Sequence, residues 1–196
     1  MTKSVKFSLM GLLSLLIGWF LVSLIAIPTL DHYIRISNVM NRFAYSEIVL
    51  TLFVSLAIWL FYIQWTLKKL STIFLYLFYS VYFFLLFVAL FTKATTYHSL
   101  TLELFDFLKL DLRTLLEAAL NVSYFIPLGV LYGLKAKPWE FAWIALLTIT
   151  GIETIQYVFY IGTFAISDIL LNFMGCAIGY YLCQLIRPRF DKKRLI

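Results

Sequence analysis

Six apolar stretches, each long enough to cross a bilayer as a helix, are the feature that most restricts the fold of this 196-residue chain. A transmembrane helix needs about 20 mostly apolar residues. The predicted spans are residues 7–30, 48–67, 72–91, 115–134, 139–161 and 166–186. Hydrophobic residues make up 63% of the sequence and charged residues 13%, and a soluble domain of this length could not bury so much apolar surface. We therefore predict an all-α fold, a polytopic transmembrane helical bundle.

The Lys and Arg residues are unevenly divided between the two sides of such a bundle. Most of the 16 lie at the N-terminus, in the turns after residues 67 and 134, and in the tail after residue 186. Because cytoplasmic segments carry the excess of Lys and Arg, we predict that both termini are cytoplasmic and that the connections 31–47 and 92–114 face outward. Basic residues at helix ends are typical of contact with anionic lipid headgroups, so nucleic acid is not an expected partner.

Three segments are expected along the chain. The N-terminal apolar run is longer than the hydrophobic region of a signal peptide, so we interpret it as an uncleaved first span. We predict a two-span helical hairpin at 1–70, a helical membrane domain at 71–186 and a basic cytoplasmic tail at 187–196. The third span, residues 72–91, is apolar and aromatic all round. We expect it to face lipid and to carry no chemistry.

Neither a metal nor a cofactor is expected. Cys176 and Cys183 lie two turns apart on one predicted helix, or about 10.5 Å along its axis. That separation is too large for a disulfide. His32 and His98 are the only histidines, so no site built from His and Cys ligands is predicted.

Polar residues on three predicted helices fall at a similar depth. In the fifth span Glu153 lies about 12 Å from the outer end, and in the fourth span Asn121 lies about 9 Å from it. In the sixth span Asp168 lies near the outer end and Asn172 about 6 Å deeper. Gln156 is three residues from Glu153 and shares its helix face. An ionisable group inside the bilayer is costly and marks a candidate functional site.

We assign roles to these residues by their chemistry. The candidate catalytic residues are Glu153 and Asp168. The candidate ligand-binding residues are Asn121, Gln156 and Asn172. The alternative is that the amides only join helices, and that Asp168 or the adjacent Ser167 caps the last helix. Burial disfavours the charged form of a carboxyl, so we expect Glu153 to be protonated unless a cation approaches it.

Small residues and a proline accompany the polar groups. Gly175 and Gly179 continue the helix stripe of Asp168 and Asn172, where they allow another helix to approach closely. Pro127 removes a backbone hydrogen bond within the fourth span and frees a polar backbone group near Asn121. These three residues are predicted to be structural.

Three stretches together resemble the VanZ-like family of bacterial membrane proteins. They are "NVSYFIPLG" (121–129), "IETIQ" (152–156) and "ISDILLNFMGCAIG" (166–179). The family pattern is N-x-x-x-F-I-P-x-G, then an acid followed three residues later by Gln, then D-x-x-x-N-x-x-G-x-x-x-G. The resemblance covers about residues 115–182 and adds Gly129 to the structural residues. The first two spans look like an addition to the family core.

The chain departs from the family pattern before its last helix. Many members carry an Arg and further acids there, where this chain has Gly162, Thr163, Ala165 and Ser167. Many members also have an "IPF"-like motif before the fourth span, where this chain reads "LELFDFLKLD". If the missing Arg pairs with an acid in other members, Glu153 or Asp168 needs another cation here, such as Arg113.

The resemblance implies a multi-pass protein of the bacterial plasma membrane, related to a protein that confers low-level resistance to the lipoglycopeptide teicoplanin. We rank three functions. The first is binding or modification of an envelope lipid or lipid-linked glycan at the outer leaflet. The second is an enzyme with Glu153 as general acid and base, and the third is a proton-coupled transporter. Whether the chain is an enzyme stays open. A second copy of the chain, or another membrane protein, is a further candidate partner.

Overall fold

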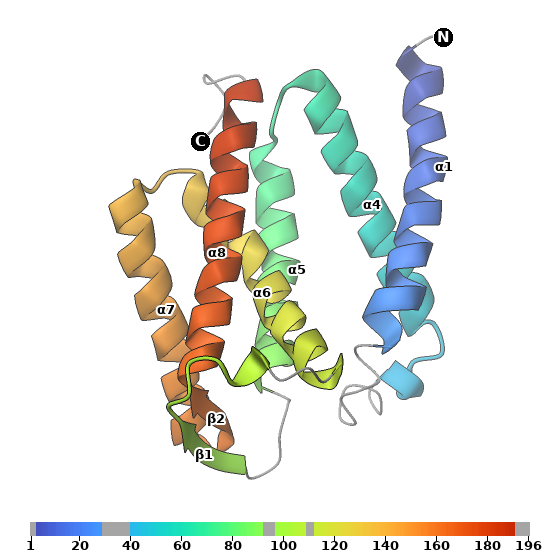
Figure 1. The fold of residues 1–196 in the computed structure, drawn as a ribbon. Coiled ribbons are helices and arrows are strands. Elements are labelled where there is room, and N and C mark those ends of the chain that lie inside the picture. The colour runs from blue at the N-terminus through green and yellow to red at the C-terminus, as the bar shows by residue number, and fades with distance from the viewer. Residues whose placement is uncertain (1–2, 29–39, 92–96, 109–111, 191–196) are drawn as a thin grey trace. The chain divides into compact units, whose positions relative to one another are not determined.

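The computed structural model describes residues 3–28, 40–91, 97–108 and 112–190. Six long helices account for most of these residues (Figure 1). They are α1 (Lys3–Leu21), which continues as the π-helical turn η1 (Val22–Ala26), α4 (Ser46–Leu67), α5 (Thr72–Phe91), α6 (Leu112–Gly133), α7 (Pro138–Val158) and α8 (Ile166–Ile186). The remaining elements are the strands β1 (Tyr97–Thr101) and β2 (Ile161–Ala165) and the short 3₁₀ turns η2 (Asp106–Leu108) and η3 (Arg187–Arg189).

All six long helices have the length and apolar composition of membrane spans. The prediction of an all-α bundle of six spans is therefore confirmed, and the protein is a multi-pass membrane protein. The fifth helix ends earlier than predicted, at Val158 rather than at 161. The chain turns there through Tyr160, whose φ of 57° is left-handed, and then enters β2. The direction of the helices across the membrane stays a prediction.

The chain packs as two compact units, residues 1–81 with 190–196 and residues 82–189. In the first unit α1 packs against α4. Gly18 lies directly against the backbone of Ser55, because a Cβ at Gly18 would be 3.0 Å from the Ser55 nitrogen. The indole of Trp59 donates a 2.9 Å hydrogen bond to the carbonyl of Phe7. The hairpin of the first two spans is thus held by close backbone approach and one indole hydrogen bond. The predicted domains 1–70, 71–186 and 187–196 stay predictions.

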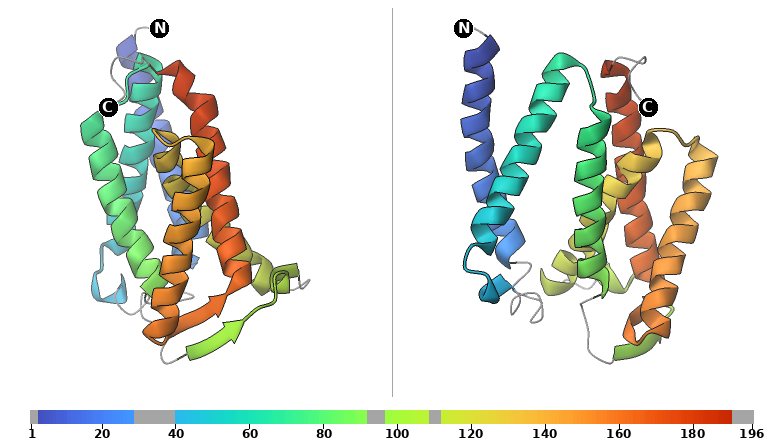
Figure 2. Two further views of the ribbon diagram at one scale, coloured as in Figure 1. Left: turned by 90° about the vertical axis from the view of Figure 1, so that its left-hand side faces the viewer. Right: turned by 180° about the vertical axis from the view of Figure 1, so that it is seen from behind.

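The second unit is built on the contact between α6 and α8, which is its most extensive helix contact (Figure 2). Glycines from both helices meet there. A Cβ added at Gly129 would lie 2.8 Å from the Cα of Cys176, and one added at Gly179 would lie 2.8 Å from the backbone nitrogen of Val130. The two backbones therefore touch, and only glycine fits at these positions. A stacked pair of rings, Phe141 and Tyr180, with centroids 4.3 Å apart, fills the core between α7 and α8.

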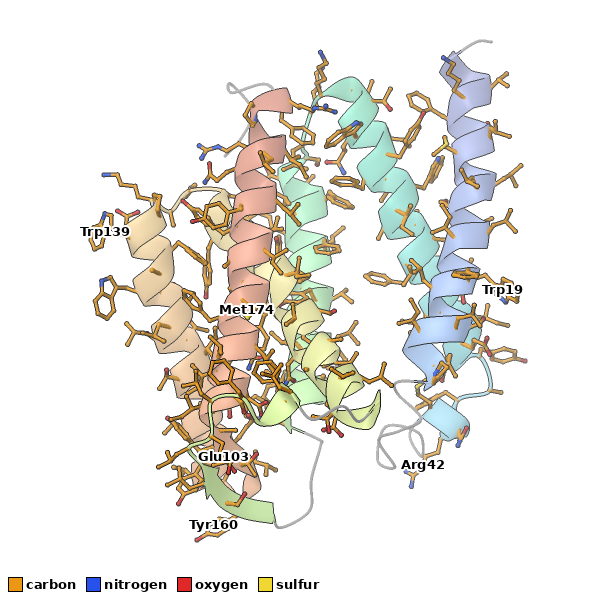
Figure 3. The ribbon with its side chains drawn as sticks, viewed as in Figure 1. Trp19, Arg42, Glu103, Trp139, Tyr160 and Met174 are labelled. Atoms are coloured by element: carbon orange, nitrogen blue, oxygen red, sulfur yellow. The ribbon has the colours of Figure 1, made fainter. Side chains whose placement is uncertain are left out.

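A small parallel sheet lies where α7 ends and α8 begins (Figure 1). β1 pairs with β2 from Tyr97 opposite Ile161 to Thr101 opposite Ala165. The exposed side chains of Glu103 and Tyr160 lie at this end of the unit, which we call the sheet end, and the exposed Trp139 lies at the opposite end of α7 (Figure 3). Tyr and Trp at the two ends of a span are typical of membrane–water interfaces. The sequence did not predict the sheet.

Candidate functional site

Glu153 on α7 and Asn172 on α8 form a buried polar pair. Each has only 2% of its surface exposed. The Nδ2 of Asn172 donates to Oε1 of Glu153 over 3.5 Å, a long distance for a hydrogen bond. The Oδ1 of Asn172 is also buried and accepts no hydrogen bond from the described part of the chain. An unsatisfied acceptor in an interior costs about 1–3 kcal/mol, so this oxygen is suited to receive a donor from outside the protein.

Asn121 and Asp168 form a second pair, between α6 and α8. The Nδ2 of Asn121 donates a 2.9 Å hydrogen bond to Oδ1 of Asp168. The interpretation of Asp168 or Ser167 as a helix cap is wrong, because α8 starts directly from β2 and its N-cap residue is Ala165. Asp168 lies instead in the first turn of α8, where a negative charge is stabilised by the helix dipole.

Gln156 connects α7 to the end of α5. Its Nε2 donates a 2.7 Å hydrogen bond to the carbonyl of Leu90. The hydroxyl of Tyr82, also on α5, donates over 2.8 Å to the carbonyl of Tyr124 on α6. The third span, which was expected to face lipid, therefore also joins its neighbours by hydrogen bonds. Leu90 is buried in the core of the unit, and the helix supplies both an acceptor and a donor to its neighbours.

These four hydrogen bonds form a closed ring of helices within the second unit. They join α5 to α7, α7 to α8, α8 to α6 and α6 back to α5. All the candidate catalytic and ligand-binding residues belong to the ring, together with two tyrosines that the sequence analysis missed. A tyrosine in an apolar helix normally finds a partner for its hydroxyl, and this signal could have identified Tyr82. The ring holds the helices in place, and within it the Glu153–Asn172 pair is the most deeply buried.

The structural residues lie beside the ring. Pro127 is inside α6, and the helix continues past it to Gly133. A Cβ added at Gly175 would collide with the carbonyl oxygen of Val122, one residue from Asn121. The close backbone contact of α6 and α8 thus sets the distance at which Asn121 meets Asp168.

Some residues of the sequence argument are not brought into the site. Glu117, four residues before Asn121 and thus on the same face of α6, is exposed. The side chains of Arg113, which was suggested as a counter-cation, and of His98 are not among those that the structure describes. His32 and Lys109 lie outside the described residues. Among the described residues there is no group of three or more His, Cys, Asp or Glu side chains that could hold a metal. Cys176 and Cys183 are buried and unbridged.

A comparison with protein families matches residues 12–187 to the family described as VanZ/LLP1. The match includes the two N-terminal helices, which the motif comparison had set apart as an addition. Among curated proteins, Protein VanZ of Enterococcus faecium is 34% identical over 79 residues, which are 38% of this chain and 48% of that protein. The chain thus spans about half the length of this curated relative. No solved structure matches.

Proposed function

This chain belongs to the VanZ/LLP1 family, and on that premise we propose that it binds an envelope lipid or lipid-linked glycan in the bacterial plasma membrane. The polar part of the ligand contacts the Glu153–Asn172 pair. The VanZ-like resemblance implies a contribution to lipoglycopeptide resistance. Such a contribution follows if the bound ligand is one of the envelope components that the antibiotic contacts. Chemical modification of the ligand by Glu153 is the alternative.

The observation that carries the proposal is the buried amide oxygen of Asn172, which lacks a hydrogen-bond donor among the described residues. The amide nitrogen of Asn172 donates a hydrogen bond to Glu153, whereas its Oδ1 accepts none from the described residues. A sugar or a hydroxylated headgroup supplies O–H donors, and a headgroup amine supplies N–H donors. Either satisfies the amide oxygen and offsets the cost of leaving it unpaired.

The charges at the ends of the second unit support ligand entry from the sheet end. Lys135 and Lys137 in the α6–α7 turn and Arg187 after α8 are exposed at the opposite end of the unit. If this basic end is cytoplasmic, as the Lys and Arg distribution predicts, the sheet end and the buried pair lie toward the outer leaflet. Envelope lipids and lipid-linked glycans are available there.

The immediate neighbour of Glu153 favours binding over reaction. The side-chain hydrogen bond that Glu153 accepts from α8 comes from a carboxamide, which positions the carboxyl but is not a nucleophile. An acid and base reaction at this carboxyl would therefore need a nucleophile from elsewhere, such as water. Binding needs only the hydrogen-bonding groups already in place.

Native mass spectrometry of the protein, purified in a mild detergent, tests the proposal. We expect a lipid of defined mass to remain bound, and we expect Asn172→Leu to lose it. Gln184→Leu is the matched control, because Gln184 on the same helix donates a 3.1 Å hydrogen bond to the carbonyl of Gly133 on α6, far along α8 from the pair. If the unaltered protein retains no lipid, or if the two variants lose it equally, the proposal is wrong.

A further inference from the structure

An open groove of about 370 Å³ runs between α7 and α8, and the side chains that line it are apolar. On α7 the lining includes Ala142 and Leu146, and on α8 it extends from Ile166 to Phe173. Leu104, in the segment that follows β1, contributes from the sheet end. The groove is separate from the hydrogen-bonded ring, because none of its lining residues takes part in the four helix-joining bonds.

The position of the groove limits what can fill it. Its walls belong to two membrane spans, Pro138–Val158 and Ile166–Arg189, so its occupant lies beside the hydrocarbon of the bilayer. Along α8 the lining covers seven residue steps, or about 10 Å. A packed helix would need a longer apolar stripe than this, whereas a single hydrocarbon chain fits a short groove that is open to the bilayer.

On both helices the residues that line the groove lie within about three turns of the polar pair. Ala142 and Leu146 precede Glu153 by eleven and seven residues on α7, spacings that place all three on one stripe of the helix. On α8, Phe173 directly follows Asn172, and Ile169 precedes it by three residues. Glu153 lies closer than Leu146 to the sheet end of α7, and Leu104 and Ile166 carry the groove to that same end, where a lipid headgroup at this membrane surface would be found.

We propose that this groove holds one hydrocarbon chain of the lipid whose polar part contacts the Glu153–Asn172 pair. This inference rests on the proposed function and narrows it. The ligand is anchored in the membrane by its own chain and enters sideways from the bilayer, so a water-soluble glycan lacking a chain is a poor ligand. The apolar wall from α7 and α8 supplies affinity, and the buried pair supplies selection of the headgroup.

The test fills the groove and measures the lipid retained. The protein is reconstituted in vesicles of phosphatidylethanolamine and phosphatidylglycerol, extracted in mild detergent and analysed by native mass spectrometry. Ala142→Phe places a ring in the groove, and we expect about a tenfold loss of retained lipid, since burial of only two methylene groups accounts for such a factor. Leu147→Phe is the control, because Leu147 is on the same helix, is 69% exposed and does not line the groove.

Each outcome separates the two proposals. Loss in Ala142→Phe with retention in Leu147→Phe supports the groove as the chain site. Equal retention in both variants overturns the groove while the proposed function stands, and absence of lipid from the unaltered protein overturns both. If Ala142→Phe does not fold, as judged by size-exclusion chromatography, Leu170→Phe fills the groove from its other wall and is judged by the same comparison.

Discussion

Asn121 on α6 donates a 2.9 Å hydrogen bond to Asp168 on α8, although the two residues are 47 positions apart in the chain. On the sequence alone the two residues have separate predicted roles, Asn121 in ligand binding and Asp168 in catalysis. Their pairing means that neither acts alone, because changing one alters the hydrogen bonding of the other. The same bond ties the N-terminal turn of α8, which follows the sheet, to the helix that passes beside it.

The first prediction concerns the coupling of this pair. Asn121→Ala and Asp168→Ala should each destabilise the protein, and the double variant should lose less than the sum. Interhelical hydrogen bonds in membranes average about 0.6 kcal/mol and reach about 1.7 kcal/mol, so a coupling energy in this range is expected. A double-mutant cycle on unfolding in detergent measures it. Strict additivity of the two single changes would contradict the pairing.

A second prediction concerns the glycines between α6 and α8. Gly175→Ala would place a Cβ against the carbonyl oxygen of Val122, and overpacking of this kind typically costs about 1–3 kcal/mol. Gly151→Ala is the matched control, because nothing lies within 4 Å of a Cβ at Gly151. Replacing a glycine inside a helix by alanine stabilises by roughly 0.5–1 kcal/mol where there is space. Thermal unfolding of both variants in detergent should therefore shift in opposite directions, and a shift in the same direction would contradict the close contact.

The sequence predicts the helices well because each span is a continuous apolar run, whose length alone identifies it. Because the rise of a helix per residue is regular, the sequence also predicts that Glu153 and Asn172 lie at a similar depth. It does not reveal the acceptor of Gln156, because the carbonyl of Leu90 has no side-chain signature. It also misses the sheet, because "YHSLT" and "IGTFA" are short segments whose pairing depends on contacts distant in sequence.

The third prediction tests the role of α5 in the ring. Tyr82→Phe removes the hydroxyl that donates to the carbonyl of Tyr124 and keeps the aromatic side chain. We expect a loss of about 0.5–1.5 kcal/mol in stability, the usual contribution of one hydrogen bond. Tyr76→Phe is the control, because Tyr76 lies on the same helix and is largely exposed. Equal effects of the two changes in thermal unfolding would show that α5 is joined to α6 by apolar packing alone.

The fourth prediction fixes the orientation of the protein. Lys69 and Lys137 are predicted to face the cytoplasm. The connection 92–114, which contains His98, Glu103 and Lys109, is predicted to face outward. Single cysteines at Lys137 and at Glu103 are accessible because both side chains are exposed, while the native cysteines are buried. In intact cells, a membrane-impermeant thiol reagent should label Glu103→Cys and not Lys137→Cys. Labelling of Lys137→Cys alone would invert the topology and with it the leaflet of the proposed ligand.

The final prediction concerns Glu153 and separates binding from reaction. Glu153→Gln keeps the size of the side chain and its acceptor oxygen for Asn172 but cannot exchange a proton. Glu153→Leu removes both. Glu140→Gln is the control on the same helix, where Glu140 accepts a hydrogen bond from the backbone nitrogen of Lys137 at the opposite end of α7. Expression of all variants is matched in a bacterial host, and teicoplanin susceptibility is measured as the readout.

If the site only binds, Glu153→Gln should retain most of the activity, because a neutral carboxyl and a carboxamide offer a ligand a similar acceptor and a donor. Glu153→Leu should then lose activity, since Asn172 would face an apolar side chain in a buried position. If Glu153 transfers a proton, Glu153→Gln should be as inactive as Glu153→Leu, and Glu153→Asp should keep partial activity because its carboxyl is drawn back by one methylene. The control Glu140→Gln should behave as the unaltered protein in either case. Unaltered activity in both Glu153→Gln and Glu153→Leu would show that the buried acid has no part in the function.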